Sequence, residues 1–239
     1  SGFSVSSAGD VDEDGRADLL IGARTANGND NGEFWAGGAY LIAAADLEAL
    51  DAADGTVDGV IDLAHVQNGA ASYRFVGVDG GDLSGSLVSS AGDVDGDGRA
   101  YLLIGARQAD GIGNGESLAG KTYLIAVDDL EALDEADGAK DGVIDLSHVQ
   151  SGAASYRFVG ADGGDNSGWS VSSAGDVDRD GYADLLIGTP YADGNGEGGA
   201  GETYLISGVD LETLDAADGV EDGGIDLANG QNGTASYLF

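Results

Sequence analysis

The chain has 239 residues, of which 44 are Asp or Glu and 9 are Lys or Arg, so its formal net charge is −35. This charge argues against nucleic acid and anionic membrane surfaces as partners, and a compact body that carries it needs bound cations or high salt. The chain has no cysteine, which excludes disulfides and thiol chemistry, and it shows neither a signal peptide nor an apolar run long enough for membrane insertion.

Along the chain, the first predicted strand covers residues 3–8, which are short of large side chains, as suits a strand near a crowded axis. An acidic hairpin loop with the sequence GDVDEDGRAD follows at residues 9–18. The second predicted strand, residues 17–23, contains a Leu-Leu-Ile run that favours burial on both faces. A glycine-rich loop at residues 27–32 then leads to a third predicted strand at residues 38–42.

A helix of one or two turns is expected over residues 46–50, where Asp46 can cap the helix and Leu47 and Leu50 share a face. A second acidic loop at residues 51–63 precedes the fourth predicted strand, residues 71–75. A glycine-rich linker completes the unit.

The unit recurs with a period of 83 residues, because Gly9, Gly92 and Gly175 open the same motif (92 − 9 = 83 and 175 − 92 = 83). Four short antiparallel strands per repeat with glycine-rich turns are typical of a propeller blade. We therefore predict an all-β fold, a β-propeller of four-stranded antiparallel blades with short helical insertions. The three blades form one domain and cover residues 1–83, 84–166 and 167–239.

Two segments of the third unit carry a family resemblance. Gly-Trp-Ser-Val at 168–171, followed by GDVDRDGYADLLIGTP at 175–190, resembles the FG-GAP repeat of integrin alpha-subunit propellers and their bacterial relatives. The resemblance implies a β-propeller with calcium in the hairpin loop between the first two strands of a blade. The family's closing Gly-Ala-Pro survives here only as Gly-Thr-Pro at 188–190, since Arg24 and Arg107 replace the proline in the other units.

The hairpin loop itself has carboxylates at alternate positions and a glycine for the turn, which is what Ca²⁺ requires from a short continuous segment. The alternative is a solvated acidic turn. The second copy has Tyr101 at the ninth position, where the other copies have aspartate, so we expect a weaker site there. Arg16, Arg99 and Tyr182 would contribute backbone carbonyls. The candidate ligands are Asp10, Asp12, Asp14, Arg16 and Asp18; Asp93, Asp95, Asp97 and Arg99; and Asp176, Asp178, Asp180, Tyr182 and Asp184.

The second acidic loop has aspartates at positions one, five and nine of a similar frame, with glycine at position six. Position twelve is His65, His148 or Asn229, where an EF-hand has glutamate. Metal binding therefore competes with a capped, glycine-rich acidic turn as the interpretation of this loop. The candidate ligands are Asp54, Asp58 and Asp62; Asp137, Asp141 and Asp145; and Asp218, Asp222 and Asp226.

Aromatic residues at repeating strand positions are expected to pack in the core; they are Phe3, Trp169, Tyr40, Tyr123 and Tyr204. Trp35, beside Phe34 in a loop, is outside this pattern and is the first place to look for a partner.

Repetition of the same side chains in each unit favours a binding module over an enzyme, because catalysis usually requires one unrepeated constellation. We predict a non-enzymatic, calcium-binding module of a secreted or cell-surface bacterial protein that acts in adhesion or binds a protein or glycan ligand. The alternatives are an architectural repeat without a ligand and a non-catalytic part of a secreted enzyme that acts on polysaccharide or phosphoester. Since propellers usually have four to eight blades, three blades suggest a homodimer that closes a six-bladed ring.

Overall fold

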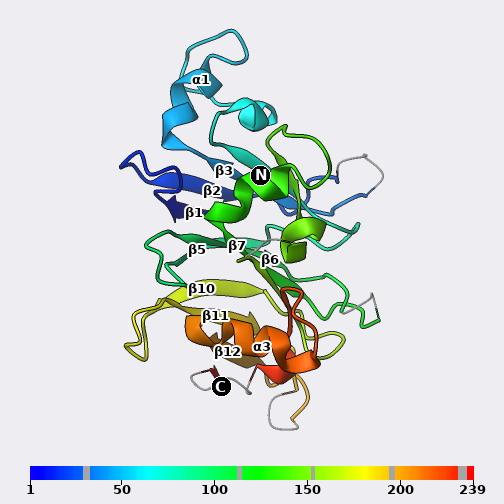
Figure 1. Cartoon of the computed structure of the whole chain (residues 1–239). Coiled ribbons are helices and arrows are strands. Elements are labelled where there is room, and N and C mark those ends of the chain that lie inside the picture. Colours follow the sequence, from blue (N-terminus) through cyan, green and yellow to red (C-terminus); the bar gives the residue numbers. More distant parts are fainter. Residues whose placement is uncertain (29–32, 112–114, 152–153, 194–196, 231–235) are drawn as a thin grey trace.

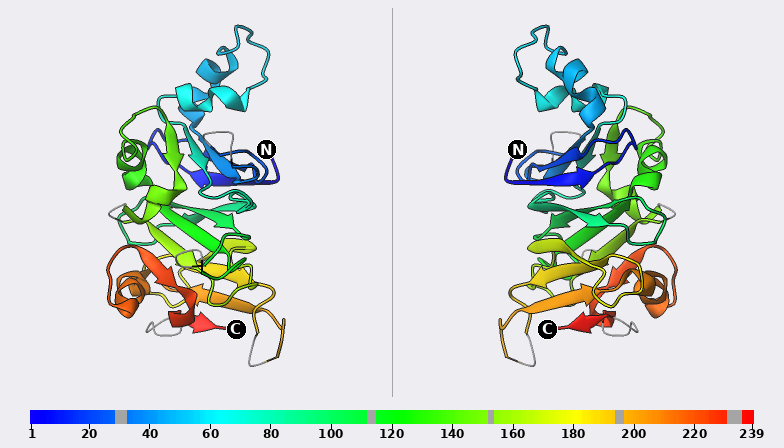
Figure 2. Two further views of the ribbon diagram at one scale, coloured as in Figure 1. Left: turned by 90° about the vertical axis from the view of Figure 1, so that its right-hand side faces the viewer. Right: turned by 90° about the vertical axis from the view of Figure 1, so that its left-hand side faces the viewer.

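The computed structural model describes residues 1–28, 33–111, 115–151, 154–193, 197–230 and 236–239, apart from the side chains of Asn68, Gln150, Ser151 and Asp218. The described residues form an all-β structure of three sheets with a few short helices (Figure 1). Figure 2 shows the sheets stacked in chain order, from the N-terminal sheet in blue to the C-terminal sheet in orange and red.

Each repeat builds an antiparallel sheet from four of its own strands, as the sequence predicts. The first sheet contains β1 (Ser4–Gly9), β2 (Asp18–Gly22), β3 (Gly38–Ile42) and β4 (Tyr73–Val76). The second contains β5 (Leu87–Gly92), β6 (Tyr101–Ala106), β7 (Lys121–Ala126) and β9 (Tyr156–Val159). The third contains β10 (Ser170–Gly175), β11 (Asp184–Thr189), β12 (Glu202–Ile206) and β14 (Tyr237–Leu238).

A fifth strand joins two of these sheets from the following repeat. Strand β8 (Val143–Asp145) pairs in parallel with β4, and β13 (Gly224–Asp226) pairs in parallel with β9. The Arg74 N–H donates to the Gly142 carbonyl at 2.8 Å, and the Arg157 N–H donates to the Gly223 carbonyl at 2.7 Å. In the second and third repeats, the end of the second acidic loop, which the sequence predicts as a loop, therefore crosses to the preceding sheet. We call residues 143–145 and 224–226 the crossing segments, together with their first-repeat counterpart 60–62, which forms no strand.

Each insertion also contains a short helix: α1 (Leu47–Asp51), α2 (Leu130–Asp134) and α3 (Leu211–Asp215), preceded by the 3₁₀ turns η1 (Ala44–Asp46), η4 (Val127–Asp129) and η7 (Gly208–Asp210). Further 3₁₀ turns are η2 (Leu63–Asn68), η5 (Leu146–Ser151), η8 (Ala216–Asp218) and η9 (Leu227–Asn229). In the described part of the chain, none of the helices has the length and apolar character needed to cross a membrane.

Asp46 does not cap α1 with its side chain, contrary to the sequence prediction. Its carboxylate instead accepts the Ser72 hydroxyl at 2.7 Å and the N–H groups of Ala70 and Ala71 at 3.0 Å. The aspartate thus ties the helix to the segment that enters β4. This long-range contact takes the place of a local cap.

The hydrophobic core lies between the sheets. We call the side of a sheet that faces the preceding repeat its leading face, and the opposite side its trailing face. The trailing faces of the first two sheets pack on the leading faces of the sheets that follow, which gives two large buried clusters. A third, smaller cluster consists of Ile42, Leu50 and Val66 with partly buried neighbours on the leading face of the first sheet.

Burial on both faces is confirmed for β6, all of whose residues are buried, but it is wrong for β2. Leu19 is 44% exposed, whereas its counterpart Leu102 is fully buried. Val5 and Val88 differ in the same way, at 69% and 3% exposure. These side chains are exposed because no sheet of the described residues packs on the leading face of the first sheet.

The expectation of core packing is confirmed for Tyr123 and Tyr204, which are 1% and 3% exposed. It is wrong for Phe3 and Trp169, which are 57% and 40% exposed. The guanidinium of Arg24 lies 3.6 Å from the Phe3 ring centroid, and that of Arg107 lies 4.2 Å from the Trp169 centroid. The arginines that replace the family's proline therefore stack on these exposed rings.

Candidate metal centres

The hairpin loops that join β1 to β2, β5 to β6 and β10 to β11 each bring carboxylates together. In each group, three carboxylate oxygens lie within 4.8 Å of one another. The groups are Asp10, Asp12 and Asp18; Asp93, Asp95 and Asp97; and Asp176, Asp178 and Asp184. Gly15, Gly98 and Gly181 form the turn in the three loops with φ of 87°, 90° and 99°, a conformation that favours glycine.

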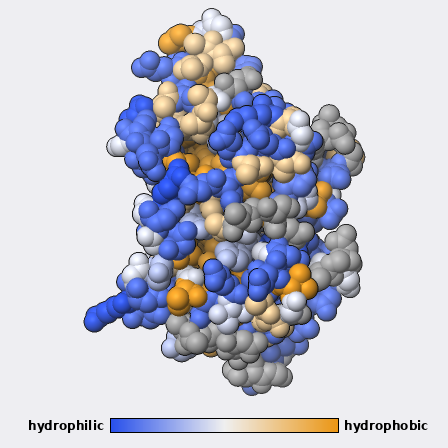
Figure 3. Space-filling model, viewed as in Figure 1, coloured by the Kyte–Doolittle hydropathy of each residue, from blue (hydrophilic) through white to orange (hydrophobic). Residues whose placement is uncertain are grey.

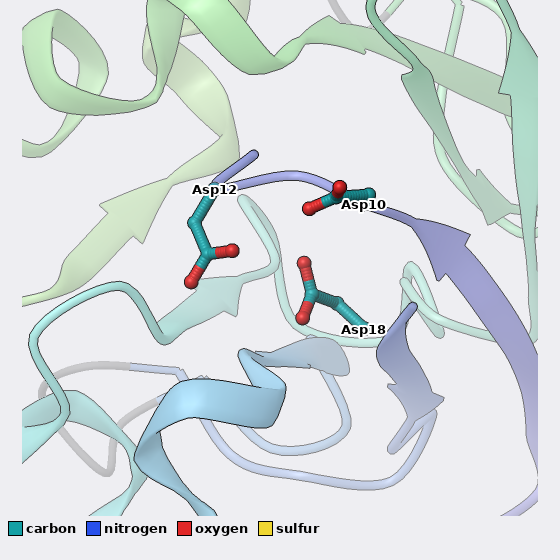
Figure 4. A group of neighbouring side chains, drawn as sticks. All are labelled: Asp10, Asp12 and Asp18. Carbon is teal, nitrogen blue, oxygen red and sulfur yellow. The ribbon is translucent and has the colours of Figure 1, made fainter. Parts of the chain in front are cut away.

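Asp18 anchors the first group, because it is fully buried at the start of β2. Its Oδ2 accepts the Val11 N–H at 2.7 Å, and its Oδ1 accepts the Ala44 N–H at 2.8 Å. Asp10 accepts the Gly15 N–H at 2.9 Å, which closes the loop. Figure 4 shows the carboxylates of Asp10, Asp12 and Asp18 converging on one space.

Asp14, also predicted as a ligand, lies outside this group. Its carboxylate accepts the Arg16 guanidinium at 2.5 Å, and this hydrogen bond holds the pKa of Asp14 below its usual value. The pKa of Asp12 is raised, first by burial and then by the negative charges of Asp18, Asp14 and Asp10. A cation among these carboxylates would relieve that repulsion.

In the third loop, Asp184 is 1% exposed and its Oδ2 accepts the Val177 N–H at 2.8 Å. Its Oδ1 is buried and has no hydrogen-bond partner among the described residues. Burial and the charges of Asp180, Asp184 and Asp176 raise the pKa of Asp178. An unpaired buried carboxylate oxygen costs free energy unless a cation or a hydrogen-bond donor meets it. Asp184 is therefore a candidate metal ligand.

Asp180, at the fifth position of the third loop, also lies outside the carboxylate group. The Ser207 hydroxyl lies 3.4 Å from its carboxylate, and its other oxygen accepts the Tyr182 N–H at 2.8 Å. The first and third loops therefore use positions one, three and nine to form their groups. The backbone carbonyls of Arg16, Arg99 and Tyr182 are not part of any carboxylate group, and their role as ligands stays a prediction.

The second loop is built differently, because Tyr101 occupies the ninth position. The Tyr101 hydroxyl donates to Asp95 Oδ2 at 3.1 Å, and burial together with the charge of Asp95 raises the pKa of this hydroxyl. The group consequently uses Asp97 in place of a ninth-position carboxylate. Arg99 forms ion pairs with Glu13 of the first loop, at 3.1 Å, and with Asp128. The sequence pattern did not predict these contacts between repeats.

The second acidic loops contribute no group of three converging carboxylates in the part of the chain that the structure describes. Asp54, Asp58 and Asp62 each accept the N–H two residues further on, at 2.8, 3.0 and 2.9 Å. The same contacts recur for Asp137, Asp141, Asp145, Asp222 and Asp226, while the side chain of Asp218 lies outside the described residues. This pattern favours a capped acidic turn.

Comparison with protein families agrees with the loop geometry. The FG-GAP repeat model matches residues 1–36, which hold the first loop with β1 and β2, and residues 167–206, which hold the third loop with β10 to β12. The resemblance to FG-GAP repeats is thereby confirmed in the first and third repeats. Among curated proteins, no sequence matches the chain.

The donor sets suit a hard cation. Each group offers carboxylate oxygens alone, and Asp184 in the third group has a buried Oδ1 without a partner among the described residues. Ca²⁺ takes six to eight oxygen ligands in flexible geometry, so backbone carbonyls and water would complete such a shell.

Proposed function

We propose that this chain is a calcium-binding FG-GAP module in which Ca²⁺ fixes the hairpin loops of a propeller-type fold. The observation that carries the proposal is that Asp184, whose Oδ1 is buried and unpaired among the described residues, converges with Asp176 and Asp178. Without a cation, carboxylates held this close repel one another. Calcium therefore stabilises the folded state.

The size of this stabilisation follows from linkage. A cation that binds only the folded chain contributes about 2.7 kcal/mol when its concentration is 100 times the dissociation constant. Outside cells, calcium reaches such an excess over the dissociation constant of a site of moderate affinity. This, together with the charge of −35, favours a secreted or cell-surface bacterial protein.

The loop after β2 offers a surface for adhesion. Phe34 and Trp35 are 67% and 61% exposed. Trp35 has a φ of 62°, a conformation that its counterparts Leu118 and Gly199 share at 60° and 66°. Only the first repeat places an aromatic side chain at this strained position, which supports contact with a protein or glycan ligand.

The module is proposed to act without catalysis. The converging carboxylates repeat at corresponding loops, whereas a general acid, base and nucleophile would form one unrepeated constellation. Binding and mechanical rigidity both agree with repeated sites.

Adhesion is tested by retention on protein and glycan arrays with calcium and with chelator. We expect a ligand that is retained with calcium and lost with chelator, and we expect Trp35→Leu to abolish retention. This substitution installs the residue found at position 118, so the melting temperature should not change. Retention that is indifferent to Trp35→Leu, or the absence of any retained ligand, would contradict the adhesive role.

A further inference from the structure

The two ends of the stack expose surfaces that are buried everywhere else between repeats. On the leading face, Val5 of the first sheet is 69% exposed, while its counterparts Val88 and Val171 are 3% and 5% exposed. Each of these buried valines packs against the trailing face of the preceding sheet. The first sheet therefore presents the same apolar face without its partner among the described residues.

The trailing face of the third sheet shows the complementary difference. Val177 is 55% exposed, whereas Val11 is 6% exposed and Val94 is fully buried. Phe239 is 72% exposed, whereas its counterparts Phe75 and Phe158 are 1% and 0% exposed. The third sheet thus ends in a face that is normally covered by a following repeat.

The crossing segments point to the same contact. Segments 143–145 and 224–226 form the fifth strand of a preceding sheet, but residues 60–62 are not in a strand, and Val60 is 62% exposed against 9% for Val143. Helix α1 and its loop project beyond the first sheet in Figure 2, and this projecting tip carries hydrophobic side chains in Figure 3. At the other end, no described segment pairs with the outer edge of β14.

A pocket on the third sheet supplies an independent match. Its volume is about 380 Å³, and it is lined in part by Gly188, Thr189, Gly201 and Glu202. At the corresponding place on the first sheet sits Ser84–Gly85, where the Gly38 N–H donates to the Ser84 carbonyl at 2.8 Å. Ser167 makes the corresponding bridge to Gly120 on the second sheet.

Ser84–Gly85 and Ser167–Gly168, which occupy this position on the first and second sheets, have counterparts at the start of the described chain. Ser1 and Gly2 correspond to Ser84 and Gly85, and both are exposed. Gly2 has a φ of 75°, against 74° for Gly85 and 75° for Gly168. A Cβ on Gly85 would lie 1.9 Å from the Gly38 carbonyl oxygen, so this close fit requires glycine. Gly2 already has the conformation that the pocket would accept.

We propose that the leading face of the first sheet docks on the trailing face of the third sheet of a second copy of this chain. The contact repeats the packing between consecutive repeats, with residues 60–62 added in parallel to β14 and Ser1–Gly2 seated in the pocket. In the proposed contact, the Leu238 N–H of one copy would donate to the Gly59 carbonyl of the other, as the Arg74 N–H donates to the Gly142 carbonyl within one chain. Three sheets from each of two copies close one ring of six, a number within the range of propellers.

The test uses light scattering and sedimentation with calcium present, because calcium offsets the repulsion between two chains of charge −35. We expect the wild-type chain to have twice its mass of 23.7 kDa. A mass of one chain at the highest soluble concentration would overturn the proposal, and so would species larger than two chains.

Two substitutions break the contact from opposite sides. Val5→Asp alters the leading face and Phe239→Asp alters the trailing face, and both side chains are mostly exposed in one chain, so neither change should disturb its fold. We expect each variant alone to have the mass of one chain. An equimolar mixture should recover pairs, because the intact leading face of Phe239→Asp fits the intact trailing face of Val5→Asp.

The matched control is Phe34→Asp, which makes the same chemical change at 67% exposure, away from both faces. We expect it to keep the mass of two chains. If this control also separates the copies, or if the mixture of the two face variants stays as single chains, a head-to-tail contact is excluded. Circular dichroism spectra that match the wild type exclude misfolding as the cause.

Discussion

Two buried aspartates at the same loop position differ in their hydrogen bonds. Both oxygens of Asp18 accept backbone N–H groups, whereas Oδ1 of Asp184 has no partner among the described residues. An asparagine at 184 can keep the bond from Val177 and place its NH₂ where the unpaired oxygen lies. At 18, an NH₂ group would oppose the N–H of either Val11 or Ala44.

We therefore predict that Asp184→Asn and Asp18→Asn affect the stability of the chain differently when calcium is removed by chelator. Asp184→Asn should keep or raise the melting temperature, and Asp18→Asn should lower the free energy of unfolding by about 1–3 kcal/mol. Both variants should lose part of the rise in melting temperature that calcium gives the wild-type chain. Differential scanning calorimetry with and without calcium measures both effects. A full calcium response in either variant would count against that loop as a metal site.

Tyr101 limits the second loop as a calcium site. We predict that Tyr101→Asp raises the calcium affinity of this loop about tenfold, since affinity follows the number of charged ligands. In chelator the variant should be less stable by about 3–5 kcal/mol, because a buried aromatic side chain is lost. Calorimetric titration checks the affinity, with Tyr101→Asn as a control that lacks the charge. Equal calcium affinity in both variants would refute the role assigned to position nine.

Asp82, in the linker between the first two sheets, should make stability depend on pH. It is 4% exposed, and burial raises its pKa from 3.8 to about 6, against the opposing effects of the Asp79 N–H and the Lys121 charge. Between these values the native chain binds more protons than the unfolded chain, so the free energy of unfolding falls as pH rises, by up to about 3 kcal/mol.

Urea unfolding in chelator from pH 4 to 7 measures this dependence. Asp82→Asn should remove this fall in the free energy of unfolding between pH 4 and 6, whether or not it changes the overall stability of the chain. The same pH slope in the variant and the wild-type chain would show that Asp82 does not carry it.

The acidic spacing predicted which residues gather in the first and third loops, because these groups depend on local sequence. It did not predict that Asp14 pairs with Arg16 or that Tyr101 binds Asp95. Those contacts depend on which rotamer each side chain adopts in the folded loop. Spacing alone carries no information on rotamers.

The crossing segments couple consecutive repeats. Gly142, just before β8, has a φ of 74°, and a Cβ there would lie 2.7 Å from the Gln67 carbonyl oxygen of the preceding repeat. Gly59, its counterpart in the first repeat, has a φ of 80° with nothing within 4 Å. Replacing either glycine would strain the backbone in the same way, because both have a positive φ. Only Gly142 has a neighbour, Gln67, that an added Cβ would meet.

We predict that Gly142→Ala lowers the free energy of unfolding by about 1–3 kcal/mol more than Gly59→Ala. Both are compared in the Phe239→Asp background, which removes the proposed contact between copies. Chemical denaturation measures the difference. Equal losses would mean that the fifth strand tolerates a side chain at this point and adds little to the coupling of the repeats.

The strand order within a repeat was predictable, since each of the four main strands follows its neighbour along the chain. The fifth strand was not. A fifth strand has three residues, as in Val143–Asp145, which is too short for a recognisable strand pattern. These residues form a strand only because they pair with the edge of the preceding sheet. Tertiary pairing decides their structure.

For the whole molecule, the core depends on stacking. Both large clusters lie between sheets, so each repeat is stabilised by its neighbours, as in other repeat architectures. This arrangement explains why Leu19 was expected in the core and is exposed. A period in the sequence predicts equal repeats, but it cannot say which of them lacks a neighbour.

The most direct test of calcium binding is a calorimetric titration of chelator-stripped protein, with the melting temperature followed at each step. The three carboxylate groups predict two tight sites per chain, in the first and third loops, a weaker site in the second loop, and a large rise in melting temperature. Absence of calcium-binding heat, with an unchanged melting temperature, would contradict the account and identify the loops as an acidic surface adapted to salt.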